Sequence, residues 1–146
     1  MSIDILPDQR VTLITLGVRD LARAKAFYHA LGWHPAREME GVVFYQLHGL
    51  ALGLFGLDDL AEDQGRPVAR LGTGAVTLAQ NFRTEEEVDA AIHRAERAGA
   101  TVLKRPEAVS WGGYSGYVAD PDGHVWEYAM NPLWTLGEEG ALVLPA

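Results

Sequence analysis

Two stretches of the chain carry apolar side chains at steps of three and four residues, the spacing of one face of a helix. They run from residue 21 to 31 and from 85 to 98. The first stripe consists of Leu21, Ala24, Phe27, Tyr28 and Leu31, and the second of Val88, Ala91, Ile92, Ala95 and Ala98. The pattern predicts two amphipathic helices, each with one face buried against a neighbouring element.

Polar residues and glycines mark the ends of both helices. Asp20 is a suitable N-cap for the first, and Gly32 stands where a left-handed residue ends a helix. Thr84 and Glu87 have the spacing of a capping box at the start of the second, and Gly99 ends it. The helix boundaries are therefore predicted at both ends.

Short β-type runs surround the helices. One precedes each helix, beginning near Thr15 and near Thr77, and a weakly marked one spans 33–38. The clearer runs after the helices cover 42–47, 50–55, 101–103, 113–119 and 124–130. His48-Gly49 separates the first two of these, and Asp120-Pro121-Asp122-Gly123 forms a turn between the last two.

The order of these elements repeats once along the chain. We predict a single α+β domain over 1–146: module one at about 11–57, a connector at 58–72, module two at about 73–132 and a tail at 133–146. Each module has the order βαβββ. Because each helix covers one face of its sheet, the opposite faces are free to line a cavity, where small-molecule sites form.

Composition removes several classes of function. The 146 residues have a formal net charge of −8 and no cysteine, which excludes thiolate ligands and disulfide frameworks and argues against a nucleic-acid partner. No apolar run approaches the roughly 18 residues of a membrane span, so we expect no membrane partner. The first ten residues lack the apolar core of a signal peptide, and we expect a cytoplasmic protein.

Two motifs in this order resemble the glyoxalase, bleomycin-resistance and extradiol-dioxygenase superfamily, also called vicinal oxygen chelate proteins. The first runs from Val11 through Asp20-Leu21 and Phe27-Tyr28 to Leu31-Gly32, and the second is the D-P-D-G-x-x-x-E run from Asp120 to Glu127. The resemblance spans roughly Thr12 to Pro132. It implies two paired βαβββ modules, each an incomplete barrel, usually in a homodimer. It does not fix an activity, because the fold serves lyases, isomerases, dioxygenases and binding proteins.

Enzymes of this family hold a divalent metal with four inward residues, and the resemblance places these positions on Leu13, Gly53, Ala75 and Glu127. Only Glu127 has a side chain that can ligate, and one carboxylate does not hold a catalytic metal. No pair of histidines has a usual ligand spacing. We therefore expect no metal and no other cofactor, and a metal-dependent dioxygenase becomes an unfavourable assignment.

Glu127 is the candidate catalytic residue. Alternation along the last strand places it on the face opposite Trp126 and Tyr128, and a four-residue turn would bring Gly116 opposite it, with Tyr114 and Val118 on its side. A poorly hydrated carboxylate there could act as a general base or receive a ligand's donor. Equally, it could hydrogen-bond a neighbour and have only a structural role.

Four further residues are candidate ligand contacts: Trp111, Tyr114, Asn81 and Phe55. The aromatic Trp111 precedes two glycines and Tyr114 follows them, as at a mobile cavity mouth, although ordinary packing explains such aromatics too. Asn81 could offer its amide to a ligand or cap a turn, and Phe55 shares the strand parity of Gly53.

These features favour a metal-free protein of this superfamily that binds a small organic molecule. The alternatives are a lyase or isomerase that uses Glu127 as base, a metal-dependent member with a non-standard site, and a structural dimer with a vestigial cavity. The apolar tail, 133–146, indicates a homodimer interface or a cover over the barrel mouth.

Overall fold

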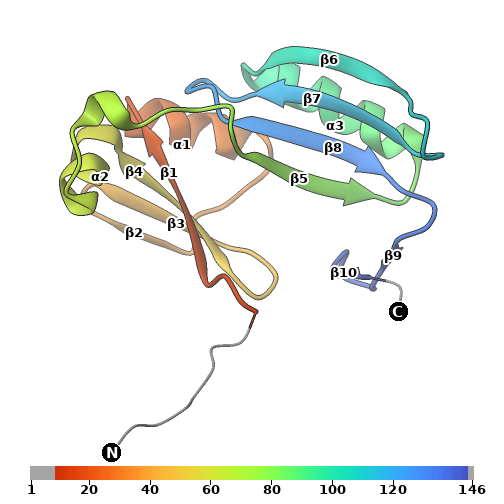
Figure 1. The fold of residues 1–146 in the computed structure, drawn as a ribbon, viewed down its shortest axis with the longest axis horizontal. Helices are drawn as coiled ribbons and strands as arrows, with labels where there is room; N and C mark the ends of the chain where they lie inside the picture. Colours follow the sequence, from red (N-terminus) through yellow and green to blue (C-terminus); the bar gives the residue numbers. More distant parts are fainter. Residues whose placement is uncertain (1–8, 145–146) are drawn as a thin grey trace, which may run out of the picture.

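Residues 9–144, the part of the chain that the computed structural model describes, form two four-stranded sheets joined by helices (Figure 1). The first sheet has the order β1-β4-β3-β2, with β1 at Leu13–Val18, β2 at Arg37–Met39, β3 at Val42–Gln46 and β4 at Ala51–Gly56. β1 runs parallel to β4, and the other pairs are antiparallel.

The second sheet repeats this topology in the order β5-β8-β7-β6. Its strands are β5 at Thr77–Phe82, β6 at Thr101–Ala108, β7 at Tyr114–Ala119 and β8 at Val125–Met130. β5 is parallel to β8, as β1 is to β4. Each module is therefore βαβββ and neither sheet closes on itself, which confirms the predicted α+β fold of two incomplete barrels.

The two predicted helices form with the predicted caps. In α1, Leu21–Ala30, the Asp20 side chain accepts a hydrogen bond from the Arg23 N–H. In α3, Glu85–Ala98, the Thr84 hydroxyl accepts one from the Glu87 N–H, and Gly99 ends the helix in the left-handed conformation with a φ of 115°. Figure 1 shows α3 behind β7 and β8, and the buried face of α3 consists of the predicted residues Val88, Ala91, Ile92 and Ala95.

The connector is more structured than its sequence indicated. It contains a helix, α2, at Leu57–Gln64 and a 3-10 turn, η1, at Val68–Arg70. α2 contacts β1 and β4 on the face that α1 leaves free. This approach is possible because Gly17 has no side chain, which would collide with Leu57 and Leu60. Leu57, Leu60 and Ala61 do have helical spacing, but four acidic residues in the same eight made the segment resemble a polar loop.

One continuous core joins the modules. Tyr28 of α1 is fully buried; its hydroxyl donates to Asp120 Oδ2 at 2.7 Å and accepts from Trp126 Nε1 at 3.1 Å. The rings of Tyr45 and Trp33 pack on Tyr28 at centroid distances of 6.0 and 5.6 Å. The helical face of module one is therefore held directly to the last hairpin of module two.

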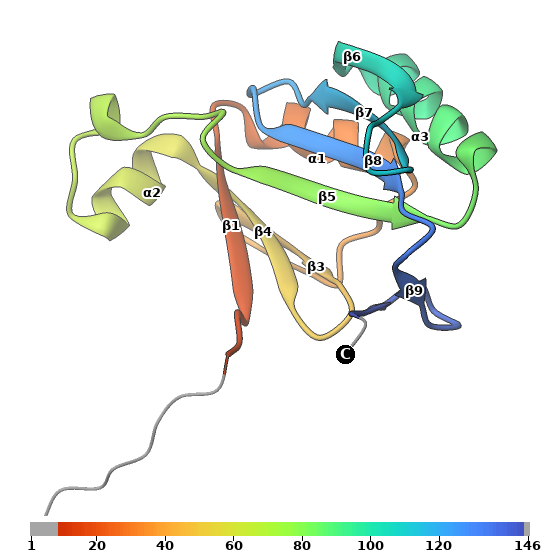
Figure 2. The same ribbon diagram turned by 45° about the vertical axis from the view of Figure 1, so that its right-hand side comes forward.

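The tail forms a small hairpin of β9, Thr135–Leu136, and β10, Leu142–Val143. Figures 1 and 2 both show it beside the end of β5. The Arg83 guanidinium, just after β5, donates to the carbonyls of Leu136 and Gly137 and so anchors the hairpin. Leu133, at 71% exposure, and the apolar side chains of β10 remain exposed.

Candidate functional site

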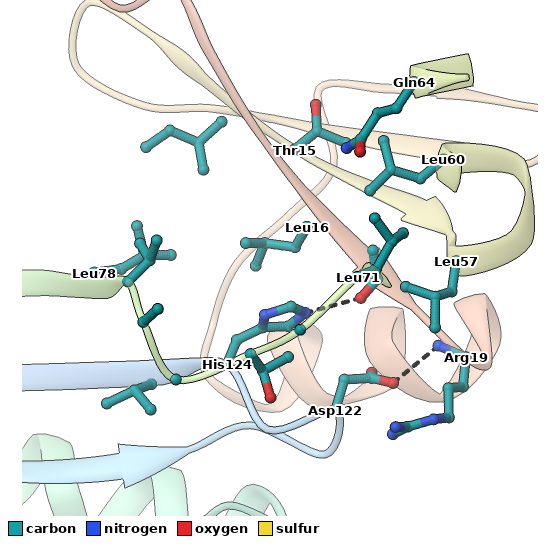
Figure 3. Close-up of a pocket in the computed structure, with 18 of the residues that line it drawn as sticks. Thr15, Leu16, Arg19, Leu57, Leu60, Gln64, Leu71, Leu78, Asp122 and His124 are labelled. Atoms are coloured by element: carbon teal, nitrogen blue, oxygen red, sulfur yellow. Dashed lines mark hydrogen bonds between the residues drawn. The ribbon is translucent and has the colours of Figure 1, made fainter. Parts of the chain in front are cut away.

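A cavity of about 470 Å³ lies where the two modules meet, near the end of β1 and the start of β5 and β8 (Figure 3). Its volume falls within the range of about 300–1,000 Å³ usual for small-molecule sites. It takes its walls from β1, α2, the segment before β5 and the 120–124 loop, and its lining includes Thr15, Leu16, Gly17, Arg19, Leu57, Leu60, Gln64, Arg66, Leu71, Thr73, Ala75, Val76, Leu78, Asp122 and His124. We call it the junction cavity.

The junction cavity wall combines apolar and polar side chains. α2 presents Leu57 and Leu60, and β1 presents Leu16. Gly17 is needed in this wall, because a Cβ there would lie 2.7 Å from Leu57 Cδ1 and 2.9 Å from Leu60 Cδ2. The absence of a side chain at Gly17 thus lets α2 approach β1 and close one side of the cavity.

The polar part of the wall comes from the D-P-D-G-H run. His124 Nε2 lies 2.8 Å from the Gly17 carbonyl oxygen, which fixes the imidazole against β1. Asp122 is buried, and its Oδ1 accepts from the Arg19 N–H at 2.9 Å and from Arg23 Nη2 at 3.0 Å. The turn that joins β7 to β8 therefore also ties module two to β1 and α1.

A second group of polar side chains lies on the face of the second sheet that α3 does not cover. The strand register puts Lys104 beside Tyr117 and Tyr117 beside Glu127. Burial, and then the negative charge of Glu127, raises the pKa of Tyr117, so its phenol stays protonated to a higher pH than usual. Lys104 forms an ion pair with Glu107 at 2.9 Å. We call Lys104, Tyr117 and Glu127 the open-face row.

The pairing predicted for Glu127 is wrong by one residue. Tyr117, not Gly116, lies opposite it, because the connection between β7 and β8 spans 120–124 and Ala119 pairs with Val125. Each residue of β7 is therefore on the other face from the one predicted. Tyr114 belongs to the helix side, where its hydroxyl donates to Asp89 of α3 at 2.6 Å, and Val118 is fully buried in the core.

The five predicted site residues do not come together around the junction cavity, and none of them lines it. Glu127 and Asn81 share one face of the second sheet, since Ala79 pairs with Glu127 and Asn81 with Ala129. Tyr114 bonds Asp89 on the opposite face, and that hydrogen bond raises its pKa to about 12. Trp111 is 46% exposed in the loop before β7, and Phe55 belongs to β4 of the first sheet.

The family's metal does not fit the four corresponding positions. Leu13, Gly53 and Ala75 offer no donor atom, and a Cβ at Gly53 would meet the Phe44 ring at 3.1 Å, so a longer ligand is not accommodated there without rearrangement. Across residues 9–144, no group of three or more His, Asp or Glu side chains could hold a metal ion. Glu127 stands as a lone carboxylate.

Sequence reasoning did not find the junction cavity because its lining is dispersed. Thr15 and Leu16 belong to an edge strand, Gln64 and Arg66 to a segment taken as connector, and His124 to the loop before β8. The available signal was the D-P-D-G-H run itself, in which Asp122 was interpreted only as a turn residue and His124 only as the start of a strand.

In the described part of the chain, no helix is long and apolar enough to cross a membrane. The chain has 39% identity to a glyoxalase-related enzyme from Fulvimarina pelagi, with a TM-score of 0.88 over 94% of this chain and 99% of that one. It has 26% identity to lactoylglutathione lyase from Agrobacterium tumefaciens, with a TM-score of 0.68 over 90% of this chain and 100% of that one.

A shorter similarity is to the uncharacterized protein Mb0911c of Mycobacterium bovis, 51% identical over 56 residues, which are 38% of this chain and 35% of that protein. The match thus spans about a third of the mycobacterial relative. The sequence model of the Glyoxalase/Bleomycin resistance protein/Dioxygenase superfamily matches residues 10–128. Together with the paired βαβββ modules, this match shows that the chain belongs to the Glyoxalase/Bleomycin resistance protein/Dioxygenase superfamily.

Proposed function

We propose that this protein binds a small organic molecule in the junction cavity. The observation that carries the proposal is the combination of about 470 Å³ of space with several leucine side chains and a few fixed polar groups in its wall. Such a combination suits a ligand with an apolar body and one or two polar atoms. The location differs from the one expected from the sequence, which was centred on Glu127, Trp111 and Tyr114.

Filling the cavity tests this proposal. Ala75 lines the cavity and is itself exposed, so Ala75→Trp can place an indole in the space without disturbing the core. Ala90→Trp on the exposed side of α3, outside the cavity, is the matched control. With 2-naphthol and 2-methoxynaphthalene as probes, we expect Ala75→Trp to weaken the binding of both by at least about tenfold in calorimetry. Unchanged binding to Ala75→Trp would contradict the proposal.

A second candidate is a lyase or isomerase that uses Glu127 as general base. Its support is the open-face row: Tyr117 stands beside Glu127, where a phenol that remains protonated can donate to a developing oxyanion while the carboxylate accepts a proton. The similarity to a lactoylglutathione lyase fits this class. Under this candidate Glu127→Gln retains ligand binding and loses turnover, whereas a purely structural Glu127 predicts no kinetic change.

We also propose a homodimer that uses the tail. Leu133, Val143 and Leu144 are each at least 60% exposed, although the hairpin is anchored by Arg83, so its apolar side chains are held in a fixed position on the surface. Exposed apolar patches of this kind mark interfaces. Deletion of 133–146 should convert the dimer to a monomer in light scattering, and an unchanged mass would refute the role of the tail.

A further inference from the structure

The contact of His124 with β1 determines which of its ring nitrogens is free. A carbonyl oxygen only accepts hydrogen bonds, so the 2.8 Å contact between His124 Nε2 and the Gly17 carbonyl requires a proton on Nε2. In the neutral ring, Nδ1 then has a lone pair and acts as an acceptor. Figure 3 shows the ring within the cavity wall, next to Leu16.

Asp122 supplies a second unsatisfied acceptor in the same wall. Its side chain is 3% exposed, and only Oδ1 is used by Arg19 and Arg23. Oδ2 is buried and has no hydrogen-bond partner in the described part of the chain. Because leaving a buried acceptor unpaired costs free energy, this end of the cavity favours a ligand group that donates a hydrogen bond.

The cationic side chains of the lining do not reverse this preference. Arg66 is exposed and its Nη2 donates to the Arg70 carbonyl. The Arg19 side chain extends below Asp122 in Figure 3, away from Leu16 and Leu60. Both guanidinium groups therefore lie at the edge of the cavity. The 120–124 loop contributes hydrogen-bond acceptors, His124 Nδ1 and Asp122 Oδ2, to the wall.

We propose that the junction cavity recognises alcohols or phenols with an apolar body, and that His124 Nδ1 accepts the hydrogen bond of the ligand hydroxyl. The ligand body packs against Leu57 and Leu60 of α2. This inference rests on the proposed function, since it names the ligand class of the same cavity. His124 is a binding residue that neither the sequence resemblance nor the open-face row indicated.

The experiment compares 2-naphthol, which has a hydroxyl donor, with 2-methoxynaphthalene, which has the same rings and no donor. In calorimetry we expect replacement of His124 by Phe to weaken 2-naphthol binding by about tenfold and to leave binding of the ether within about twofold. His48→Phe, in the exposed turn between β3 and β4, is the matched control and should change neither affinity.

A readout on the unaltered protein avoids dependence on the folding of the variant. In histidine side-chain ¹⁵N spectra, 2-naphthol should shift the Nδ1 resonance of His124 and the ether should not. An equal effect of His124→Phe on both probes, or an Nδ1 resonance that 2-naphthol leaves in place, would overturn the assignment of His124 while leaving binding in the cavity intact. If Ala75→Trp affects neither probe, the proposed function itself fails.

Discussion

Substitution by Phe should have opposite effects on stability at the two buried tyrosines Tyr28 and Tyr45. Tyr28 donates to Asp120 and accepts from Trp126, whereas the Tyr45 hydroxyl is buried without a partner in the described part of the chain. Both rings belong to the aromatic cluster that joins the modules, and their centroids are 6.0 Å apart. The two tyrosines thus form a matched pair within one core.

The magnitude follows from the groups that lose a partner. Tyr28→Phe leaves a buried Asp120 oxygen and the Trp126 indole N–H unpaired; a hydrogen bond to a charged group contributes about 1.5–3 kcal/mol and a neutral one about 1 kcal/mol. We therefore expect a loss of about 3 kcal/mol. Tyr45→Phe removes an unsatisfied hydroxyl, and we expect a change between zero and a gain of about 1 kcal/mol.

Urea unfolding followed by far-UV circular dichroism measures both changes. The slope of the free energy with urea should be the same in both variants, so that the midpoints report stability directly. For a chain of this size, the loss in Tyr28→Phe corresponds to a fall in Tm of roughly 6–12 °C. Equal stability of the two variants would refute the conclusion that the Tyr28 hydroxyl links the modules.

Three further outcomes test other parts of the structure. Burial raises the pKa of Tyr45 to about 12, so as the pH rises above 10 this phenol ionises in the unfolded chain before it does in the folded one. The free energy of unfolding should therefore fall by up to about 2–3 kcal/mol between pH 10 and 12. Urea titrations at each pH should show that Tyr45→Phe removes this part of the loss. Asp122→Ala, which removes the acceptor of Arg19 N–H and Arg23, should cost about 2 kcal/mol, against a negligible change for Asp63→Ala in the exposed part of α2. Thr84→Ala should cost about 1 kcal/mol in thermal unfolding, while Thr84→Asp retains the cap and should restore most of it.

The elements with strong local signals were predictable from the sequence. Asp20 and Thr84 cap α1 and α3 because their side chains accept hydrogen bonds from free backbone N–H groups, and Gly99 ends α3 because it readily adopts a positive φ. Few residue types can do either. The paired βαβββ order followed from these helices and from the D-P-D-G run. Such features depend on neighbours in the sequence and need no knowledge of tertiary contacts.

The β7 register was missed because the loop before β8 is one residue longer than predicted. The packing of α2 and the position of His124 were missed because they depend on contacts between distant parts of the chain. The 120–124 loop shifts the register of β7 by one position, which reverses the faces of Tyr114 and Tyr117. Leu57 and Leu60 can pack against β1 only because Gly17, about forty residues earlier in the chain, has no side chain. His124 becomes a cavity residue only through its bond to the Gly17 carbonyl, which no local pattern encodes.

A crystal structure of the whole chain with 2-naphthol distinguishes binding in the junction cavity from binding at the open-face row. We expect electron density for the naphthol in the junction cavity, with its rings on Leu57 and Leu60 and its oxygen within hydrogen-bond distance of His124 Nδ1. Density beside Glu127 and Tyr117 instead, or a junction cavity that the probe does not enter at saturating concentration, would contradict it.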